Sequence, residues 1–328
     1  MSIDKHINQI YHLIDFEEIG TIYNLINPLC QEYDNHKLLT PLHFKSALAN
    51  NILREINSIK DSHIVIHTTG KNDSFFLNNF QNLFPDKKVN IFMHVSYEYL
   101  RFKDRDREIL HSVYSQNSKR SFFVPSEEVA QQYRLAGISC NPIQLGIPEI
   151  QDNKDYKRNI PKLEEFYNKI ITTCVRSTDL YKYIKGIYTF EKIIKKNKLE
   201  EHALITGIDD QSHGSIKSKY FTQEDFLNVL YHSKMYLQFS RFESYNITAV
   251  QAKRLRIPVL LLDSEGNSSC MKGYVYSSEE ELEQELLNIL QNKGPVKKIE
   301  ANYKDSLERE NLSNFKQDLE QKLVRDDL

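Results

Sequence analysis

Short apolar runs alternate with longer stretches of helical spacing along the second half of the chain. The apolar runs are Ile170–Val175, Ala203–Thr206, Met235–Phe239, Pro258–Leu262 and Tyr274–Tyr276. The stretches with helical spacing are Tyr183–Asn197, Gln223–Ser233, Ile247–Arg256 and Glu279–Gln291. Apolar strands separated by helices of this length build βαβ units, so the pattern predicts a parallel, buried sheet.

The same alternation is fainter in the first half. The strands predicted there are His63–His67, Val89–Val95 and Ser121–Val124. A helix over Glu127–Ala136 follows Ser126, a residue type that caps free N–H groups, and Gly137 stands where glycine commonly ends a helix. Residues 1–60 are predicted to be mostly helical, with one strand near Thr21–Leu25.

A charged segment, Gln151–Leu163, has the composition of an exposed linker between two domains. Further along, Glu300–Val324 is a long and mostly polar helical pattern. We therefore predict an α/β architecture of two doubly wound, Rossmann-like domains that face a cleft. The domains are residues 1–148 and 149–300, and residues 301–328 form a long C-terminal helix, for which packing back on the first domain is one arrangement.

Composition excludes several classes of protein. The 328 residues are 40% hydrophobic and 27% charged, which is enough apolar material for a core, and a formal net charge of -2 argues against nucleic-acid binding. No run approaches the roughly 18 apolar residues of a transmembrane helix, and the N-terminus lacks the features of a signal peptide. Cysteines without a C-x-x-C spacing fit reduced thiols, so we expect a cytoplasmic protein.

The segment FSRFESYNITAVQAKRLRIPV carries the most specific chemistry in the sequence. A strand ends at Phe239, and a short loop presents Ser240 and Glu243 at its carboxyl end. A helix then begins near Asn246, and Gln251 lies about one turn inside it, within reach of the same edge. Ligands of open parallel sheets bind at this edge, where the start of a helix favours a phosphate.

This segment resembles the signature of the retaining GT-B glycosyltransferases of the group 1 family, which use nucleotide-diphosphate sugars. In that family a Glu, seven residues and a second Glu follow Ser-x-x and precede a helix and Pro-Val. Ser240 and Glu243 match, and Gln251 replaces the second Glu, which in the family accepts hydrogen bonds from the ribose. A glutamine keeps one acceptor but loses the charge. Tyr245-Asn246 replaces the usual Phe-Gly, and Asn tolerates a left-handed backbone best among non-glycine residues.

Other positions extend the resemblance upstream. Arg176 at a strand end and Lys185 before a glycine match the two cations that the family places on the donor diphosphate, with Lys182 as a rival for the second. Fixed cations are needed there because departure of a nucleoside diphosphate builds negative charge. Gly207 matches the family's strand-then-glycine turn, and Phe221 stands where a residue contacts the base.

In the first half, His94 at a strand end resembles the acceptor-domain histidine that contacts the transferred sugar. A histidine at a strand end is also often structural, and we interpret His63 and His67 as structural residues. They lie on one face of a strand, but four residues span roughly 13 Å, too far to share one metal ion. The resemblance covers about residues 60–292, without the family's opening strand and glycine-rich loop.

Motifs for other chemistries are weak or missing. Asp104-Arg-Asp106 has the Asp-x-Asp spacing of metal-binding glycosyltransferases of the other architecture, but it lies in a charged helical pattern that we interpret as solvated surface. No cluster of His, Cys and carboxylates indicates a metal site. The G-x-S-x-G, P-loop and G-x-G-x-x-G motifs are missing, which argues against a hydrolase, an NTPase and a nicotinamide enzyme.

The resemblance thus implies a retaining, metal-independent glycosyltransferase of cell-surface glycan biosynthesis. It would move a hexose-type sugar from a nucleotide-diphosphate sugar, a UDP-sugar foremost, to a glycan, lipid-linked or protein acceptor, with no metal or other cofactor. The implied catalytic residues are Glu243, which binds hydroxyls of the transferred sugar, Arg176, Lys185 and His94. The implied nucleotide-sugar site contains Ser240, Ser244, Tyr245, Asn246, Ile247, Gln251, Gly207 and Phe221.

Two other hypotheses stay open. Gln251 and the missing glycine-rich opening fit a catalytically inactive glycosyltransferase-like partner or binding subunit. The same fold also serves nucleotide-sugar epimerases and sugar phosphorylases. The sequence leaves peripheral contact with the inner face of a membrane and assembly into a homo-oligomer undecided.

Overall fold

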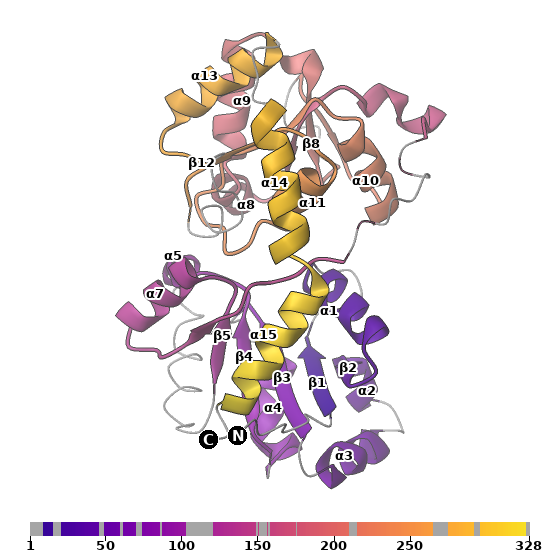
Figure 1. Ribbon diagram of the computed structural model, residues 1–328. Helices are drawn as coiled ribbons and strands as arrows, with labels where there is room; N and C mark the ends of the chain where they lie inside the picture. Colours follow the sequence, from indigo (N-terminus) through magenta and orange to yellow (C-terminus); the bar gives the residue numbers. More distant parts are fainter. Residues whose placement is uncertain are drawn as a thin grey trace. The chain divides into compact units, whose positions relative to one another are not determined.

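The computed structural model describes residues 9–15, 21–45, 49–59, 62–69, 74–85, 87–102, 121–148, 150, 156, 158–174, 176–209, 215–264, 275–291 and 296–325. The chain divides into two compact units (Figure 1). The first unit comprises residues 1–148 and 311–328, and the second comprises residues 149–310. Each unit is built on a six-stranded sheet whose neighbouring strands are all parallel.

The sheet of the first unit has the strand order β2-β1-β3-β4-β5-β6. Its strands are β1 (Gln9–Ile14), β2 (His36–Leu39), β3 (Ser62–Thr68), β4 (Val89–Met93), β5 (Phe122–Val124) and β6 (Asn141–Pro142). Its helices are α1 (Thr21–Glu32), α2 (Pro41–Lys45), α3 (Ala49–Ser58), α4 (Phe75–Leu83), α5 (Tyr97–Phe102), α7 (Glu127–Leu135) and α15 (Leu312–Arg325). Every residue of β3 is buried, as expected of a central strand in a parallel sheet covered on both faces.

The prediction for residues 1–60 was right about helices, which form α1, α2 and α3, and wrong about strands. Thr21–Leu25 is the start of helix α1 and not a strand. Its β-branched and aromatic residues suggested a strand, but the buried positions Ile22, Leu25, Ile26 and Leu29 follow the helical period. The two strands that flank this helix, β1 and β2, were missed, because histidines interrupt their short apolar runs.

The sheet of the second unit has the order β12-β11-β10-β7-β8-β9. Its strands are β7 (Ile170–Thr173), β8 (Ala203–Thr206), β9 (Lys217–Lys219), β10 (Met235–Gln238), β11 (Val259–Leu262) and β12 (Val275–Tyr276). Its helices are η1 (Pro161–Phe166), α8 (Asp179–Ile184), α9 (Ile187–Lys196), η2 (Glu200–His202), α10 (Gln223–Tyr231), α11 (Ile247–Arg254), α13 (Glu279–Leu290) and α14 (Val296–Arg309). The five strands predicted here are confirmed, and β9 is an addition.

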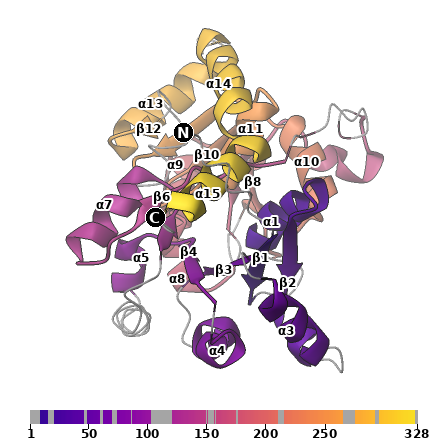
Figure 2. The same ribbon diagram turned by 60° about the horizontal axis from the view of Figure 1, so that its bottom comes forward.

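Two predicted helices are each divided in the structure. The stretch Tyr183–Asn197 is broken by Gly186 into α8 and α9. The pattern over Glu300–Val324 is not one long helix but two, α14 in the second unit and α15 in the first. Figure 1 and Figure 2 both show α15 against the sheet of the first unit, where the ring of Phe315 meets that of Phe92 at 6.2 Å between centroids. Among the described residues, no helix combines the length and the apolar character needed to cross a membrane.

Candidate functional site

The candidate site begins where strand β10 ends. The buried residues Phe239 and Ser240 follow the strand, and a partly buried loop over residues 241–246 then leads to α11. Asn246 is the N-cap of that helix, because its side-chain oxygen accepts a hydrogen bond of 3.0 Å from the backbone N–H of Ala249. Its φ of -89° is not left-handed, so Asn246 replaces glycine as a cap and not as a strained turn residue.

Side chains that are far apart in the sequence meet at Glu243. The ammonium of Lys185 lies 2.7 Å from Oε2 of Glu243, and the Ser240 hydroxyl donates to the same oxygen at 3.3 Å. Gln238 donates to the Ser240 hydroxyl at 2.6 Å, and Thr173 at the end of β7 donates to the Gln238 carbonyl at 3.2 Å. This directed chain of donors orients the Glu243 carboxylate, whose side chain is 11% exposed.

Lys185 reaches Glu243 because the corner between α8 and α9 lies directly against the end of β10. Gly186 forms that corner with a left-handed φ of 67°, and a Cβ there would collide with the backbone oxygen of Phe239. The Arg241 N–H donates to the Ile184 carbonyl at 2.9 Å and fixes the same approach. Lys182, the rival candidate, is buried, so of the two lysines it is Lys185 that the structure brings to Glu243.

Two further predicted residues lie at the carboxyl ends of neighbouring strands. Arg176 follows β7, which pairs with β10, and its exposed guanidinium lies over the ring of Tyr181 at 4.8 Å. Gly207 follows β8, the next strand, with a φ of 93°, and its N–H donates to the Lys219 carbonyl at 3.1 Å. Ser240, Glu243, Arg176 and Gly207 thus share one edge of the sheet.

The remaining predicted residues differ in their exposure. Ser244, Ile247 and Gln251 are partly exposed around the start of α11, whereas Tyr245 is buried. The ring of Phe221 packs edge-on against Phe166 at 5.1 Å, so it takes part in the packing of η1 beside the start of α10.

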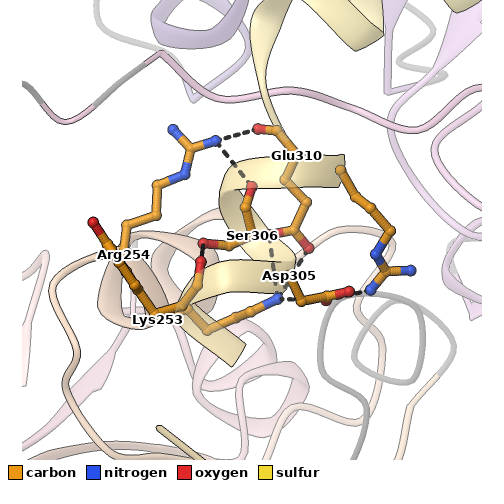
Figure 3. A network of polar contacts seen from close by, with 7 residues as sticks. Lys253, Arg254, Asp305, Ser306 and Glu310 are labelled. Carbon is orange, nitrogen blue, oxygen red and sulfur yellow. Dashed lines mark hydrogen bonds and ion pairs between the residues drawn. The ribbon is translucent and has the colours of Figure 1, made fainter. Parts of the chain in front are cut away.

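Sequence reasoning missed the residues that hold α11 in place (Figure 3). Lys253 and Arg254, which the sequence analysis did not single out, are both buried against α14. The Lys253 ammonium lies 3.2 Å from both carboxylate oxygens of Glu310 and 3.8 Å from Asp305. Arg254 donates to the backbone carbonyls of Ser306 and Glu310. Glu310 is fully buried, and this burial raises the pKa of its carboxyl group.

In the first unit, His94 follows β4 as predicted and is partly exposed. Its Nε2 lies 2.9 Å from Nδ1 of the buried His67. Asp104 and Asp106 lie outside the described residues. Within the part of the chain that the structure describes, no three His, Cys, Asp or Glu side chains converge to hold a metal ion.

Comparisons with known proteins point to one fold. No protein-family model matches the chain, and no curated protein matches its sequence. A UDP-forming α,α-trehalose-phosphate synthase from Burkholderia xenovorans superposes with a TM-score of 0.66 at 11% identity, covering 98% of this chain and 100% of that one. HepE from Anabaena, solved with UDP and glucose, gives 0.69 at 12% identity, covering 97% and 100%. The N-terminal domain of trehalose-6-phosphate phosphatase from Candida albicans gives 0.64 at 12% identity, covering 98% and 97%.

At such low identity, the likeness establishes the fold and not the activity. Together with the two parallel six-stranded sheets, it shows a two-domain α/β protein of the GT-B fold. The predicted fold class is therefore confirmed.

Proposed function

We propose that this chain transfers a sugar from a nucleotide-diphosphate sugar to an acceptor hydroxyl. The observation that carries the proposal is the Lys185–Glu243 ion pair, oriented by Ser240 at the carboxyl end of β10. It lies where ligands of parallel sheets bind. The fold supports the proposal, because one similar structure is a UDP-forming synthase and another was solved with UDP and glucose.

The cations of the site suit the departure of a nucleoside diphosphate. An ammonium has three donors, so Lys185 can bind Glu243 and still donate to a phosphate oxygen. Arg176 follows the neighbouring strand, and its guanidinium can bind phosphate oxygens in pairs. The start of α11 adds the positive end of a helix dipole. Together these groups stabilise the negative charge that grows as the sugar–phosphate bond breaks.

Glu243 is an acceptor for hydroxyls of the transferred sugar in this proposal, and Gln251 is a neutral acceptor for the ribose. The transfer retains the configuration at the anomeric carbon. The carbon–oxygen bond to the diphosphate breaks, the acceptor oxygen forms the new bond on the same face, and the departing phosphate takes the acceptor proton. No protein nucleophile and no metal ion is needed, and His94 of the first unit contacts the transferred sugar.

The donor is a UDP-sugar in this proposal, with a hexose-type sugar, and the acceptor is a hydroxyl of a glycan, a lipid-linked glycan or a protein. Thermal unfolding of the purified chain with UDP, GDP, ADP or CMP and with their sugars, in EDTA, tests the donor. Ligand at a hundred times its Kd stabilises the folded state by about 2.7 kcal/mol. We expect a rise in the unfolding midpoint with UDP and UDP-sugars, unchanged by EDTA.

Variants that each remove one positive charge show whether the rise in the unfolding midpoint comes from nucleotide bound at this site. Arg176→Ala and Lys185→Ala should each remove most of the shift and abolish transfer. Lys195→Ala removes the same charge from the exposed face of α9 and should leave both the midpoint shift and the transfer activity unchanged. Shifts that survive in both site variants would contradict the assignment of the site. A nucleotide-induced shift without turnover on any acceptor would favour the inactive binding subunit.

A further inference from the structure

A buried network of polar side chains connects the start of α11 to Glu243. Gln238, the last residue of β10, lies at its centre and is 1% exposed. Its Nε2 donates to the Ser240 hydroxyl at 2.6 Å, and its Oε1 accepts from Asn246 at 3.4 Å and from Thr173 at 3.2 Å. The Gln238 amide therefore contacts both the N-cap of α11 and the hydroxyl that donates to Glu243.

The N-cap determines which way each amide of this network points. Ala249 presents a backbone N–H to Asn246, and an N–H can only donate, so the Asn246 atom that faces it is the oxygen Oδ1. The other end of the same amide, Nδ2, faces Gln238 and can only donate, so the Gln238 atom that receives it is Oε1. Further contacts of Asn246 do not alter this order, because the Ala249 N–H sets it at the first step.

The same order continues to the carboxylate. With Oε1 of Gln238 turned to Asn246, its Nε2 faces the Ser240 hydroxyl, which must accept that bond. The single proton of the hydroxyl is then available to Oε2 of Glu243, at 3.3 Å. Four hydrogen bonds thus donate in one direction, from the backbone of α11 to Glu243.

The two carboxylate oxygens of Glu243 have different surroundings. Oε2 accepts from the Ser240 hydroxyl and from the Lys185 ammonium, the latter at 2.7 Å. Among the residues that the structure describes, no donor contacts Oε1. Each carboxylate oxygen offers about two acceptor positions, so protein donors fill Oε2 and leave Oε1 as the acceptor for a ligand.

We propose that Gln238 is a positioning residue for the proposed transfer. Its amide holds the Ser240 hydroxyl as a donor to Oε2 of Glu243, which leaves Oε1 for a hydroxyl of the transferred sugar. The identity of this ligand rests on the proposed function, in which Glu243 binds the sugar and not the nucleotide. Loss of the Gln238 amide should therefore weaken binding of a UDP-sugar and leave binding of UDP unchanged.

The orientation of the Gln238 amide can be measured without any ligand. Nuclear Overhauser contacts of its NH2 group, in the full chain with 15N-labelled glutamine, locate Nε2, and the signals that disappear in Gln238→Met assign the group. We expect stronger contacts to the Cβ protons of Ser240 than to the methyl group of Thr173. The opposite ranking in the wild-type chain overturns the proposal.

The variant Asn246→Asp should reverse the Gln238 amide while keeping the helix cap. Aspartate caps a helix as well as asparagine does, so one oxygen still accepts from Ala249. The second carboxylate oxygen can only accept, so Gln238 turns its Nε2 toward it, and the Ser240 hydroxyl then donates to Gln238 instead of Glu243. A Gln238 amide that keeps its wild-type orientation in folded Asn246→Asp overturns the proposal.

Calorimetric titration with UDP and with UDP-glucose, in EDTA, tests what this orientation does. Gln238→Met removes the donor to Ser240 and should raise the Kd for UDP-glucose about tenfold, with the Kd for UDP unchanged. Ser240→Ala should have the same effect, and the double variant should lose no more than either single variant, because both changes break one series of bonds. Equal losses for UDP and UDP-glucose, or additive losses in the double variant, overturn the proposal.

Asn228→Leu is the matched control, because Asn228 is another fully buried amide of the second unit. It accepts from the Tyr167 hydroxyl at 2.6 Å and donates to the carbonyls of Tyr156 and Arg158. It lies in the last turn of α10, the helix that leads to the start of β10 and not to its carboxyl end. This variant should lower the free energy of unfolding, as Gln238→Met does, and change neither Kd.

The two measurements separate this inference from the proposed function. A Gln238 amide that has the expected orientation, in a chain that binds neither UDP nor UDP-glucose, supports the network and contradicts the proposed function. Binding of UDP-glucose with a Kd that does not depend on Gln238 contradicts this inference alone.

Discussion

The candidate site depends on Gly186, a position where any side chain would collide with the backbone of Phe239. Gly186 combines a left-handed backbone with the closest approach of the α8–α9 corner to the end of β10. Gly137 also has a left-handed φ, of 84°, but nothing lies within 4 Å of the place where its Cβ would be. Substitutions at these two glycines therefore distinguish the free-energy cost of a left-handed backbone from the added cost of a steric collision.

We expect Gly137→Ala to lower the free energy of unfolding by about 1 kcal/mol, the cost of the left-handed conformation alone. Gly186→Ala adds a collision with the Phe239 backbone and should cost more than about 3 kcal/mol. It should also separate Lys185 from Glu243 and remove donor binding. Urea unfolding with nucleotide titration measures both effects, and equal costs for the two variants would contradict the steric argument.

At the scale of elements, the sequence predicted local features well and long-range partners poorly. Ser126 caps α7 through a 3.2 Å bond to the Val129 N–H, and Gly137 follows that helix with a positive φ, both as predicted. These signals lie within a few residues of each other. Lys253 and Glu310 are 57 residues apart, and no spacing rule connects them. The contacts that join His36, His12, His67 and His94 escaped detection for the same reason, because they depend on strand order and register in the folded sheet.

The ionic cluster between α11 and α14 gives a prediction for this pair of helices. Lys253 and Glu310 have exposed side-chain fractions of 1% and 0%. Lys253→Met leaves the carboxylate buried without its cation and should cost about 3–5 kcal/mol of unfolding free energy. The double variant Lys253→Met/Glu310→Leu removes both charges and should recover most of that loss.

Lys217→Met is the control for an exposed pair. Its partner Glu165 is 58% exposed and Lys217 is 55% exposed, so this variant should cost at most about 1 kcal/mol. Urea denaturation of the four proteins compares these costs. If Lys253→Met costs no more than Lys217→Met, the cluster does not anchor α11, and the position of Gln251 must be fixed by other contacts.

At the scale of the whole molecule, the last helix of the chain, α15, belongs to the first unit and not to the second unit that precedes it in the sequence. The chain leaves the first unit at residue 148, builds the second unit, and returns after residue 310 to add α15 to the first. Gly146 makes this return possible, because a Cβ there would collide with the backbone of Asn311. Lys322 on α15 donates to the Pro142 carbonyl, so the helix also closes over the last strand of that sheet.

Ending the chain after residue 310 should therefore unfold the first unit, although most of that unit lies far from the deleted residues in the sequence. The deletion removes four buried apolar side chains from the first unit, those of Leu312, Phe315, Leu319 and Leu323. At about 1.5–3 kcal/mol each, the loss is about 6–12 kcal/mol, which matches the whole stability of a typical domain. Hydrogen exchange should show loss of amide protection in β3 while β10, in the second unit, keeps its protection. Protection lost from β10 instead would mean that α15 stabilises the unit that precedes it in the chain, contrary to the contacts that Phe315 and Glu320 make with the first.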